Sequence, residues 1–218
     1  MTATVAWAGG TLTVGMTAGD LPVVTGNPDQ GFEGYRFVGY NLYDALVLWD
    51  LSKADKASEI KPGLAASWEI DPNDHKRWVV YLRRGVKFHD GCEFKADDVV
   101  WNYQYRMDQK APYFLAQQFA YSRTWLTNIK SVAKLDGYTV AFENNFVESL
   151  FPYSLSYVMM VSQCRAKELN YDWRNTHCIL PAQVPISSTA LCRISGSKWC
   201  RTLNTGTSRA SRGRIGWC

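Results

Sequence analysis

Residues 61–102 read KPGLAASWEIDPNDHKRWVVYLRRGVKFHDGCEFKADDVVWN. The first half of this stretch predicts two strands, 64–70 and 78–82, because apolar and aromatic residues flank the turn residues of 71–74. Both faces of the second strand carry apolar side chains, so we expect it to be buried on both sides. The first half of the stretch therefore predicts two joined strands in the interior of the protein.

The second half of the stretch predicts a tight turn followed by an amphipathic helix. Asp90 and Gly91 are typical turn residues. Apolar side chains then recur every three or four positions over 96–107, at Val99, Val100, Tyr103 and Met107. Asp97 and Asp98 look like an acid pair, but their place in the first turn is explained by the positive end of the helix.

The rest of the chain alternates between predicted helices, strands and loops. Strands are expected at 11–16, 47–50, 129–135, 138–143 and 158–161, and helices at 33–46, 113–122, 150–156 and 162–169, with loops at 17–31 and 52–62. Asp136-Gly137 is the strongest short hairpin signal, and Ser162 is the expected N-cap of the last helix. The mixture predicts an α/β fold.

The order of features in 61–102 resembles the family 5 extracellular solute-binding proteins, the dipeptide, oligopeptide and nickel receptors of bacterial ABC importers. A Gly-Leu-Ala-Ala-x-Trp strand, the run Leu-Arg-Arg-Gly-Val-Lys-Phe and a His-Asp-Gly turn precede the helix, at the family's spacing. The resemblance covers about residues 9–173. It implies a periplasmic-binding-protein type II-like fold that is incomplete here, because this chain resembles only the N-terminal part of a two-lobed receptor.

The resemblance also implies a function. Such a receptor captures a peptide or related small solute in the cleft between its lobes and delivers it to an ABC permease in the inner membrane. It needs no cofactor and is periplasmic, or extracellular and membrane-associated. Family members are more than twice as long as this chain, so we expect the chain alone to bind solute weakly or not at all.

Candidate ligand-binding residues follow from the expected cleft, which strand ends and their following loops line in folds of this kind. They are Met16, Asp20, Leu21, Tyr35, Arg36 and Phe37. Asp20 suits a ligand ammonium group, Arg36 suits a carboxylate, and Tyr35 and Phe37 suit apolar walls. An ordinary turn residue at Asp20 and a solvated helix residue at Arg36 fit the same pattern.

A small hydrolase that uses His89 and an acidic partner is the alternative from another functional class. His75, near Asp71 and Asp74, invites a similar interpretation. The sequence has no GxSxG or HExxH context for either histidine, and no P-loop or GxGxxG. Cys92 stands where the resembling family has a small residue, which favours a tolerated substitution over a nucleophile. We therefore expect no catalytic residue and no enzyme.

Charge and cysteines divide the chain near Trp173. Residues 1–173 hold 17 Lys and Arg and 20 Asp and Glu, whereas 174–218 hold seven Lys and Arg, no acid and four of the six cysteines. These four cysteines form no CxxC pair, so we expect no metal site. The basic residues are dispersed among Ser, Thr and Gly, which disfavours a nucleic-acid partner. No run of eighteen apolar residues occurs.

Three segments are expected. Residues 1–8 are a possible remnant of a signal peptide, because Ala6-Trp7-Ala8 has the pattern of a cleavage site. Residues 9–173 form the N-terminal part of the solute-binding domain, and 174–218 form a non-native or disordered tail. We expect the tail to come from a shifted reading frame, because codon degeneracy permits the family's Gly-Thr-Gly-Pro-Tyr segment across 181–186. An independent truncated binding module with a cationic tail is the other possibility.

Overall fold

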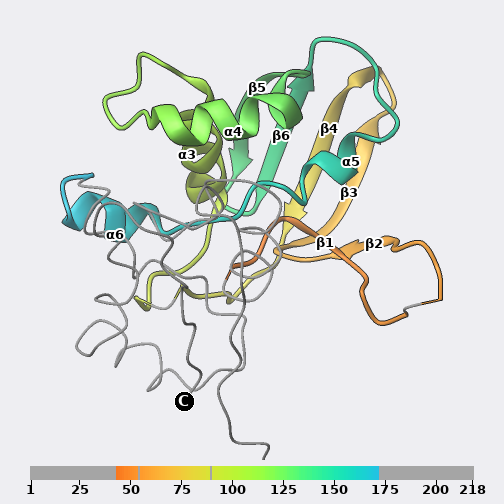
Figure 1. Cartoon of the computed structure of the whole chain (residues 1–218), viewed down its shortest axis with the longest axis horizontal. Coiled ribbons are helices and arrows are strands. Elements are labelled where there is room, and N and C mark those ends of the chain that lie inside the picture. Colours follow the sequence, from red (N-terminus) through yellow and green to blue (C-terminus); the bar gives the residue numbers. More distant parts are fainter. Residues whose placement is uncertain (1–42, 54, 89, 172–218) are drawn as a thin grey trace, which may run out of the picture.

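The computed structural model describes residues 43–53, 55–88 and 90–171 of the 218-residue chain (Figure 1). The described elements are β1 (Val47–Trp49), β2 (Ile60–Pro62), β3 (Ala65–Asp71), β4 (Asp74–Leu82), α3 (Ala96–Met107), α4 (Ala116–Leu126), β5 (Ile129–Asp136), β6 (Thr139–Asn144), α5 (Phe151–Ser154) and α6 (Gln163–Glu168). Among these helices, none has the length and apolar character needed to cross a membrane.

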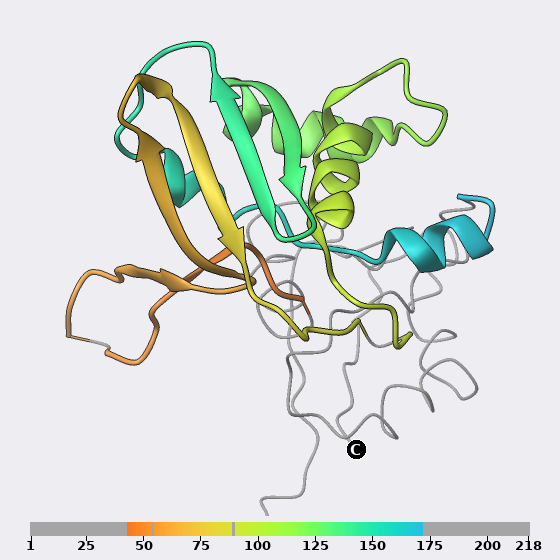
Figure 2. The ribbon, with the colours of Figure 1, turned by 180° about the vertical axis from the view of Figure 1, so that it is seen from behind.

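A four-stranded antiparallel sheet organises the described residues, with the strand order β3-β4-β6-β5. Figure 2 shows the two hairpins, β3–β4 and β5–β6, lying side by side. The central strands β4 and β6 join them, with Trp78 opposite Phe142 and Val80 opposite Val140. All four strands overlap their predicted ranges, but β4 begins at Asp74, within the predicted turn 71–74, rather than at 78. A separate two-stranded ladder pairs β1 with β2, so the predicted loop 52–62 is wrong at its last three residues.

The sheet is covered on one face, which corrects the prediction that β4 is buried on both sides. Trp78, Val80 and Leu82 are buried, but Val79 is half-buried and Tyr81 is 38% exposed. On the open face the Tyr81 hydroxyl donates a hydrogen bond of 2.6 Å to Glu69. An antiparallel sheet can leave one face in solvent, and an aromatic ring with a polar end suits such a position.

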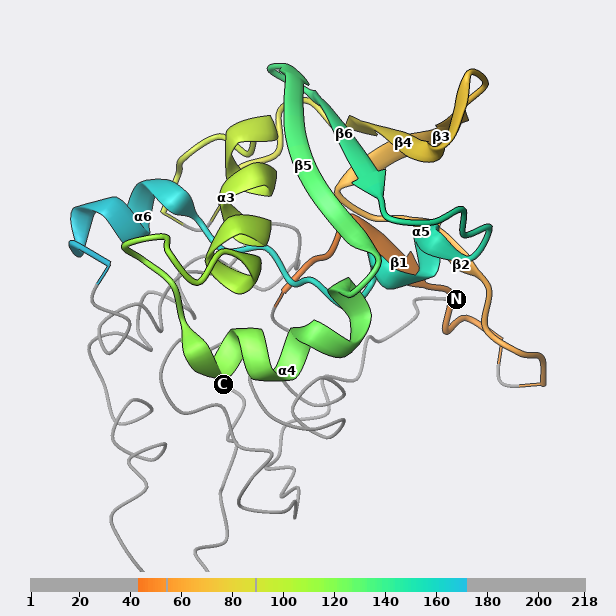
Figure 3. The same ribbon diagram turned by 90° about the horizontal axis from the view of Figure 1, so that it is seen from above.

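Helices α3, α4 and α5 lie on the covered face of the sheet (Figure 3). The rings of Tyr103 in α3 and Phe142 in β6 have centroids 4.9 Å apart, and Phe151 of α5 lies 5.8 Å from Trp78. Helix α3 has the predicted bounds, but its buried surface is wider than the predicted stripe. Trp101, for example, is buried in a second apolar cluster on another side of the helix.

Two predicted elements that pair with each other differ from the structure. Residues 43–46 are not helical, although the sequence predicts a helix over 33–46, and the earlier part of that helix lies outside the described residues. The predicted strand 158–161 is reduced to an isolated bridge between Met159 and Ala45. Both differences have one cause, because the two segments pair with each other across the fold.

The remaining helices differ from prediction mainly at their ends. Helix α4 begins at Ala116 rather than at 113, and α5 spans only Phe151–Ser154 of the predicted 150–156. Helix α6 begins as expected, since the Ser162 side chain accepts a hydrogen bond of 3.2 Å from the backbone N–H of Arg165. Such an N-cap satisfies a backbone donor that the first turn leaves free.

Gly63 lies where two segments of backbone come so close that a side chain would not fit. A Cβ atom at this position would lie 2.5 Å from the carbonyl oxygen of Ala45 and 2.9 Å from the side chain of Leu48. The Pro62-Gly63-Leu64 sequence therefore permits the chain to pass close to 45–48 as it leaves β2 for β3. Gly137, in the confirmed β5–β6 hairpin, has open space around it and no left-handed φ.

Candidate functional site

A buried polar cluster lies where α3 meets the segment 159–163. Asp98, Asn102 and Arg106 occur at four-residue intervals, so they share one face of α3. Their exposed fractions are 7%, 0% and 2%. Polar side chains as buried as these need hydrogen-bond partners, and they find them largely in the backbone of 159–163.

Asn102 binds the backbone of Val161 as a neighbouring strand would. Its Oδ1 accepts a hydrogen bond of 3.0 Å from the Val161 N–H, and its Nδ2 donates one of 2.8 Å to the Val161 carbonyl. Nδ2 also donates to the carbonyl of Asp98, at 2.8 Å. The amide group thus satisfies both backbone groups of Val161, which lies outside the four-stranded sheet.

Arg106 and Asp98 hold the two ends of the same segment. Arg106 Nη2 donates to the carbonyl of Met159 at 2.9 Å, and Asp98 Oδ1 accepts from the N–H of Gln163 at 3.2 Å. The guanidinium lies 4.2 Å from the centre of the Tyr105 ring. On its other side the segment binds 43–45, where the Met160 N–H donates to the Asp44 carbonyl at 2.9 Å.

Two carboxyl groups in this region are buried and differ in their partners. Burial raises the pKa of both Asp44 and Asp98 from 3.8 to about 6. Asp98 has two hydrogen bonds that oppose the rise, from the backbone N–H groups of Lys95 and Gln163. Asp44 has only the charge of Arg83 to oppose it, and its Oδ2 has no hydrogen-bond partner. Both carboxyl groups are therefore charged at pH 7 at a cost in stability, because burial disfavours their ionised form.

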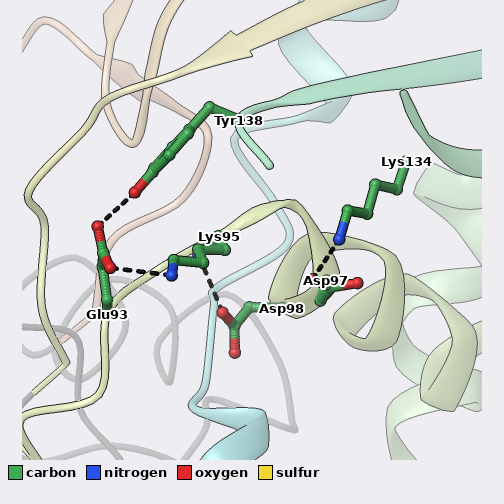
Figure 4. A network of polar contacts seen from close by, with 6 residues as sticks. All are labelled: Glu93, Lys95, Asp97, Asp98, Lys134 and Tyr138. Atoms are coloured by element: carbon green, nitrogen blue, oxygen red, sulfur yellow. Dashed lines mark hydrogen bonds and ion pairs between the residues drawn. The ribbon is translucent and has the colours of Figure 1, made fainter. Parts of the chain in front are cut away.

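A network of exposed charges surrounds the start of α3 (Figure 4). The Lys95 ammonium lies 3.0 Å from the Glu93 carboxylate, which also accepts a hydrogen bond from the Tyr138 hydroxyl. Lys134 of β5 binds Asp97 at 2.7 Å. These contacts join the first turn of α3 to the β5–β6 hairpin. The Tyr138 hydroxyl, followed by Lys95, lowers the pKa of the Glu93 carboxyl.

An open hollow of about 420 Å³ lies between α3, β5 and α6. Its lining residues are Asp97, Val100, Trp101, Gln104, Lys134, Gln163 and Lys167. Polar surface dominates this lining, whereas small-molecule sites are lined mainly by apolar and aromatic groups. The hollow is the size of a ligand pocket, but its lining does not resemble a site that encloses a solute.

The acids considered for a hydrolase shape turns in the described structure. Asp71 accepts a hydrogen bond of 2.9 Å from the N–H of Asn73, and Asp90 accepts one of 2.8 Å from the N–H of Cys92. His75 is exposed on β4, and His89 lies outside the described residues. Within the described part of the chain, no nucleophile, base and orienting group converge as catalysis requires.

Cys92 and Cys164 form a disulfide that joins the turn before α3 to helix α6, with Cα atoms 6.5 Å apart. This pairing was not predicted from the sequence. Donor atoms of Asp90 and both cysteines lie within 4.8 Å of one another, a spacing that also suits a metal ion. Because the disulfide occupies both sulfur atoms, the group does not offer thiolate ligands in this state.

The predicted ligand-binding residues Met16, Asp20, Leu21, Tyr35, Arg36 and Phe37 all lie outside the described residues. The described cluster of Asp98, Asn102 and Arg106 was not anticipated. Its four-residue spacing on a helix that is otherwise rich in aromatic residues is the signal that could have revealed it.

We expect Asn102→Ala to lower the free energy of unfolding by about 2–4 kcal/mol, because it leaves two buried backbone groups of Val161 without partners. Asn73→Ala is the control, since Asn73 is exposed in the β3–β4 turn, and should change the free energy by less than about 0.5 kcal/mol. Urea denaturation measures both. Equal effects of the two substitutions would contradict a structural role for the Asn102 amide.

Asp44 and Asp98 should lower stability as pH rises from about 4 to about 6. Their folded pKa values exceed the unfolded ones, so the folded state binds more protons in this window, and stability present below pH 4 is lost. Asp44→Asn should remove the part of this pH dependence that Asp44 contributes, up to about 3 kcal/mol. Relative to the unsubstituted chain, it should therefore be more stable at pH 7.5 but similar at pH 4.

Asp98→Asn is the matched comparison for the pH prediction. It also removes a buried charge, but it places an amide NH₂ among two backbone N–H donors, so we expect a loss of stability at pH 7.5. Urea denaturation at both pH values separates the two variants. If the free energy of unfolding of Asp44→Asn changes with pH between 4 and 7.5 as that of the unsubstituted chain does, Asp44 does not have the raised pKa.

The comparisons with known proteins agree with one another. The family described as "Bacterial extracellular solute-binding proteins, family 5 Middle" matches residues 59–179. The chain is 33% identical over 131 residues to Heme-binding protein A of Haemophilus influenzae, covering 56% of this chain and 23% of that protein. It is 35% identical over 109 residues to Di/tripeptide-binding protein 1 of Pseudomonas aeruginosa, covering 45% and 20%.

A solved structure supports the same assignment. The ABC transporter-associated periplasmic binding protein DppA of Helicobacter pylori, in complex with the peptide STSA, superposes with a TM-score of 0.58 at 28% identity. The match covers 72% of this chain and 33% of that one. The expected fold class, that of a periplasmic binding protein, is thus confirmed. The chain spans about a quarter of the length of the curated relatives it matches. With more than half of its residues matched by the family, the chain belongs to the family 5 bacterial extracellular solute-binding proteins.

Proposed function

We propose that this chain is part of the substrate-binding component of an ABC importer and that its solute is a peptide or a related small molecule. The match to the family over 59–179, which includes the whole four-stranded sheet and α3, carries the proposal. Dipeptide- and di/tripeptide-binding proteins predominate among the curated relatives. The family gives no support to the hydrolase alternative.

The proposed solute site is the cleft between two lobes, which closes over the bound molecule. Asp20 binds the peptide ammonium group and Arg36 its carboxylate, with Met16, Leu21, Tyr35 and Phe37 beside them. A pair of opposite charges at a fixed separation selects short peptides by their two charged ends. Since the chain spans about a quarter of its relatives' length, residues beyond those of this chain complete the cleft of the whole receptor.

The proposed partner is the permease of an ABC importer, and the proposed location is the periplasm. The periplasmic names of the relatives support both parts. Within the chain, we assign 9–173 to the solute-binding domain and 174–218 to a non-native tail that a shifted reading frame would produce. The absence of acids from 174–218 supports the last assignment, and sequencing the gene through the codon for Trp173 tests it.

Calorimetric titration with a panel of di- and tripeptides tests the proposed function. The protein encoded by the gene with its family-length reading frame should bind at least one peptide, and the 218-residue chain should bind it at least about 100-fold more weakly, because it lacks the residues that complete the proposed cleft. Equally tight, saturable binding by the 218-residue chain would contradict the need for further residues. No binding of any peptide by the longer protein would contradict the solute class.

Substitutions at the proposed site give a sharper version of the same test. Asp20→Asn in the longer protein should weaken peptide binding at least about tenfold, because it removes the charge opposite the ligand ammonium. Asp55→Asn is the matched control, since Asp55 is an exposed acid between β1 and β2, and its affinity should be unchanged. Loss of affinity in both variants, or in neither, would remove Asp20 from the site.

A further inference from the structure

Helix α6 is a short element with a limited set of attachments to the rest of the fold. Ala166 packs in the second apolar cluster, and the Gln163 N–H bonds to Asp98. Just after the helix, the Tyr171 ring packs against Trp101 and Tyr113. It has six residues, and only Ala166 among them is buried. Its one ion pair, Arg165 with Glu168, lies within the helix and is exposed. In Figure 1 the helix lies beyond α3, away from the sheet. An isolated helix of this length is not stable in water, so its position depends on what attaches it.

Cys92, in the turn before α3, is by contrast held by hydrogen bonds to the residues around it. The Phe88 N–H donates to the Cys92 carbonyl at 2.9 Å, and the Cys92 N–H donates to Asp90 at 2.8 Å. Gly91 has the positive φ of 90° that this turn requires. Phe88 is buried and packs edge-on against Phe94, with ring centroids 5.7 Å apart. Cys92 is therefore a fixed point attached to the main core.

We propose that the Cys92–Cys164 disulfide fastens α6 to the main core, so that the attachment of α6 depends on oxidation of this pair. The Cα separation of 6.5 Å lies within the range that a disulfide spans. The two cysteines are 72 residues apart and enclose α3, α4, α5 and the β5–β6 hairpin. Closing so long a loop constrains the unfolded chain strongly.

The chemistry is an ordinary thiol–disulfide exchange. One cysteine thiolate attacks the disulfide of an oxidant, which forms a mixed disulfide and releases half of the oxidant as a thiol. The second cysteine thiolate then attacks the protein sulfur of the mixed disulfide, which forms the Cys92–Cys164 bond and releases the other half of the oxidant as a thiol. The two cysteines together lose two electrons and two protons. Such bonds persist in secreted and periplasmic proteins but are rare in a reducing cytosol. The fastening thus acts only after the protein reaches an oxidising environment.

The fastening also protects the polar cluster next to α6. Gln163 begins α6, and its N–H binds Asp98. When α6 detaches, this hydrogen bond breaks and the carboxylate of Asp98 loses one of its two backbone donors. Reduction should therefore affect the end of the 159–163 segment as well as α6, and should leave the sheet largely unchanged.

Hydrogen exchange read by mass spectrometry tests the proposal on the 218-residue chain. The other four cysteines are first replaced by serine, at Cys178, Cys192, Cys200 and Cys218. After oxidation with glutathione disulfide, peptide mapping should find Cys92 linked to Cys164. Reduction should then raise exchange over 163–171 at least about tenfold, and over 129–144 less than about twofold.

The double variant Cys92→Ser with Cys164→Ser is the control. It should show the raised exchange over 163–171 at the outset and no response to the reductant. Unchanged exchange over 163–171 after thiol counting confirms reduction would overturn the proposal. A map in which Cys92 and Cys164 remain unlinked after oxidation would also overturn it. That second readout does not require the double variant to fold.

Discussion

The described structure depends on the hydrogen bonds between the Asn102 side chain and the backbone of Val161. Residues 159–163 follow α5 in the chain and pack against α3, where their backbone groups pair with no strand of the four-stranded sheet. A buried backbone N–H or C=O without a partner is costly. Side chains of α3 supply the missing partners on one side, and 43–45 supply them on the other. The two ends of the described region are joined at this point.

The elements that sequence predicts well are those whose signals are local. The bounds of α3 follow from its apolar spacing, and those of the β5–β6 hairpin follow from Asp136-Gly137. Gly137 does not use the left-handed conformation that makes this pair a strong signal, so the hairpin was predicted correctly for an incomplete reason. The pairing of β5 with β6 along their length also determines the hairpin.

The features that sequence misses arise from contacts between distant segments. The spacing of Asn102 and Arg106 places them on one helix face, but their partners are found only when 159–161 is placed against them. The pairing of Cys92 with Cys164 spans 72 residues, and nothing local to either cysteine indicates it. Burial of β4 on one face only is likewise decided by which side the helices cover. The candidate ligand-binding residues lie outside the described part of the chain, so their placement stays a prediction.

The sheet order leaves β3 and β5 as the outer strands of the described sheet. An outer strand with free backbone groups is a template on which another molecule can add a strand. Strand β5 carries Lys130 and Lys134, whose charges oppose the approach of a flat apolar strand. Strand β3 is irregular at both ends, where its registry with β4 shifts, and such distortions discourage regular pairing. Resistance to aggregation through strand addition is thus built into the two edges of the sheet.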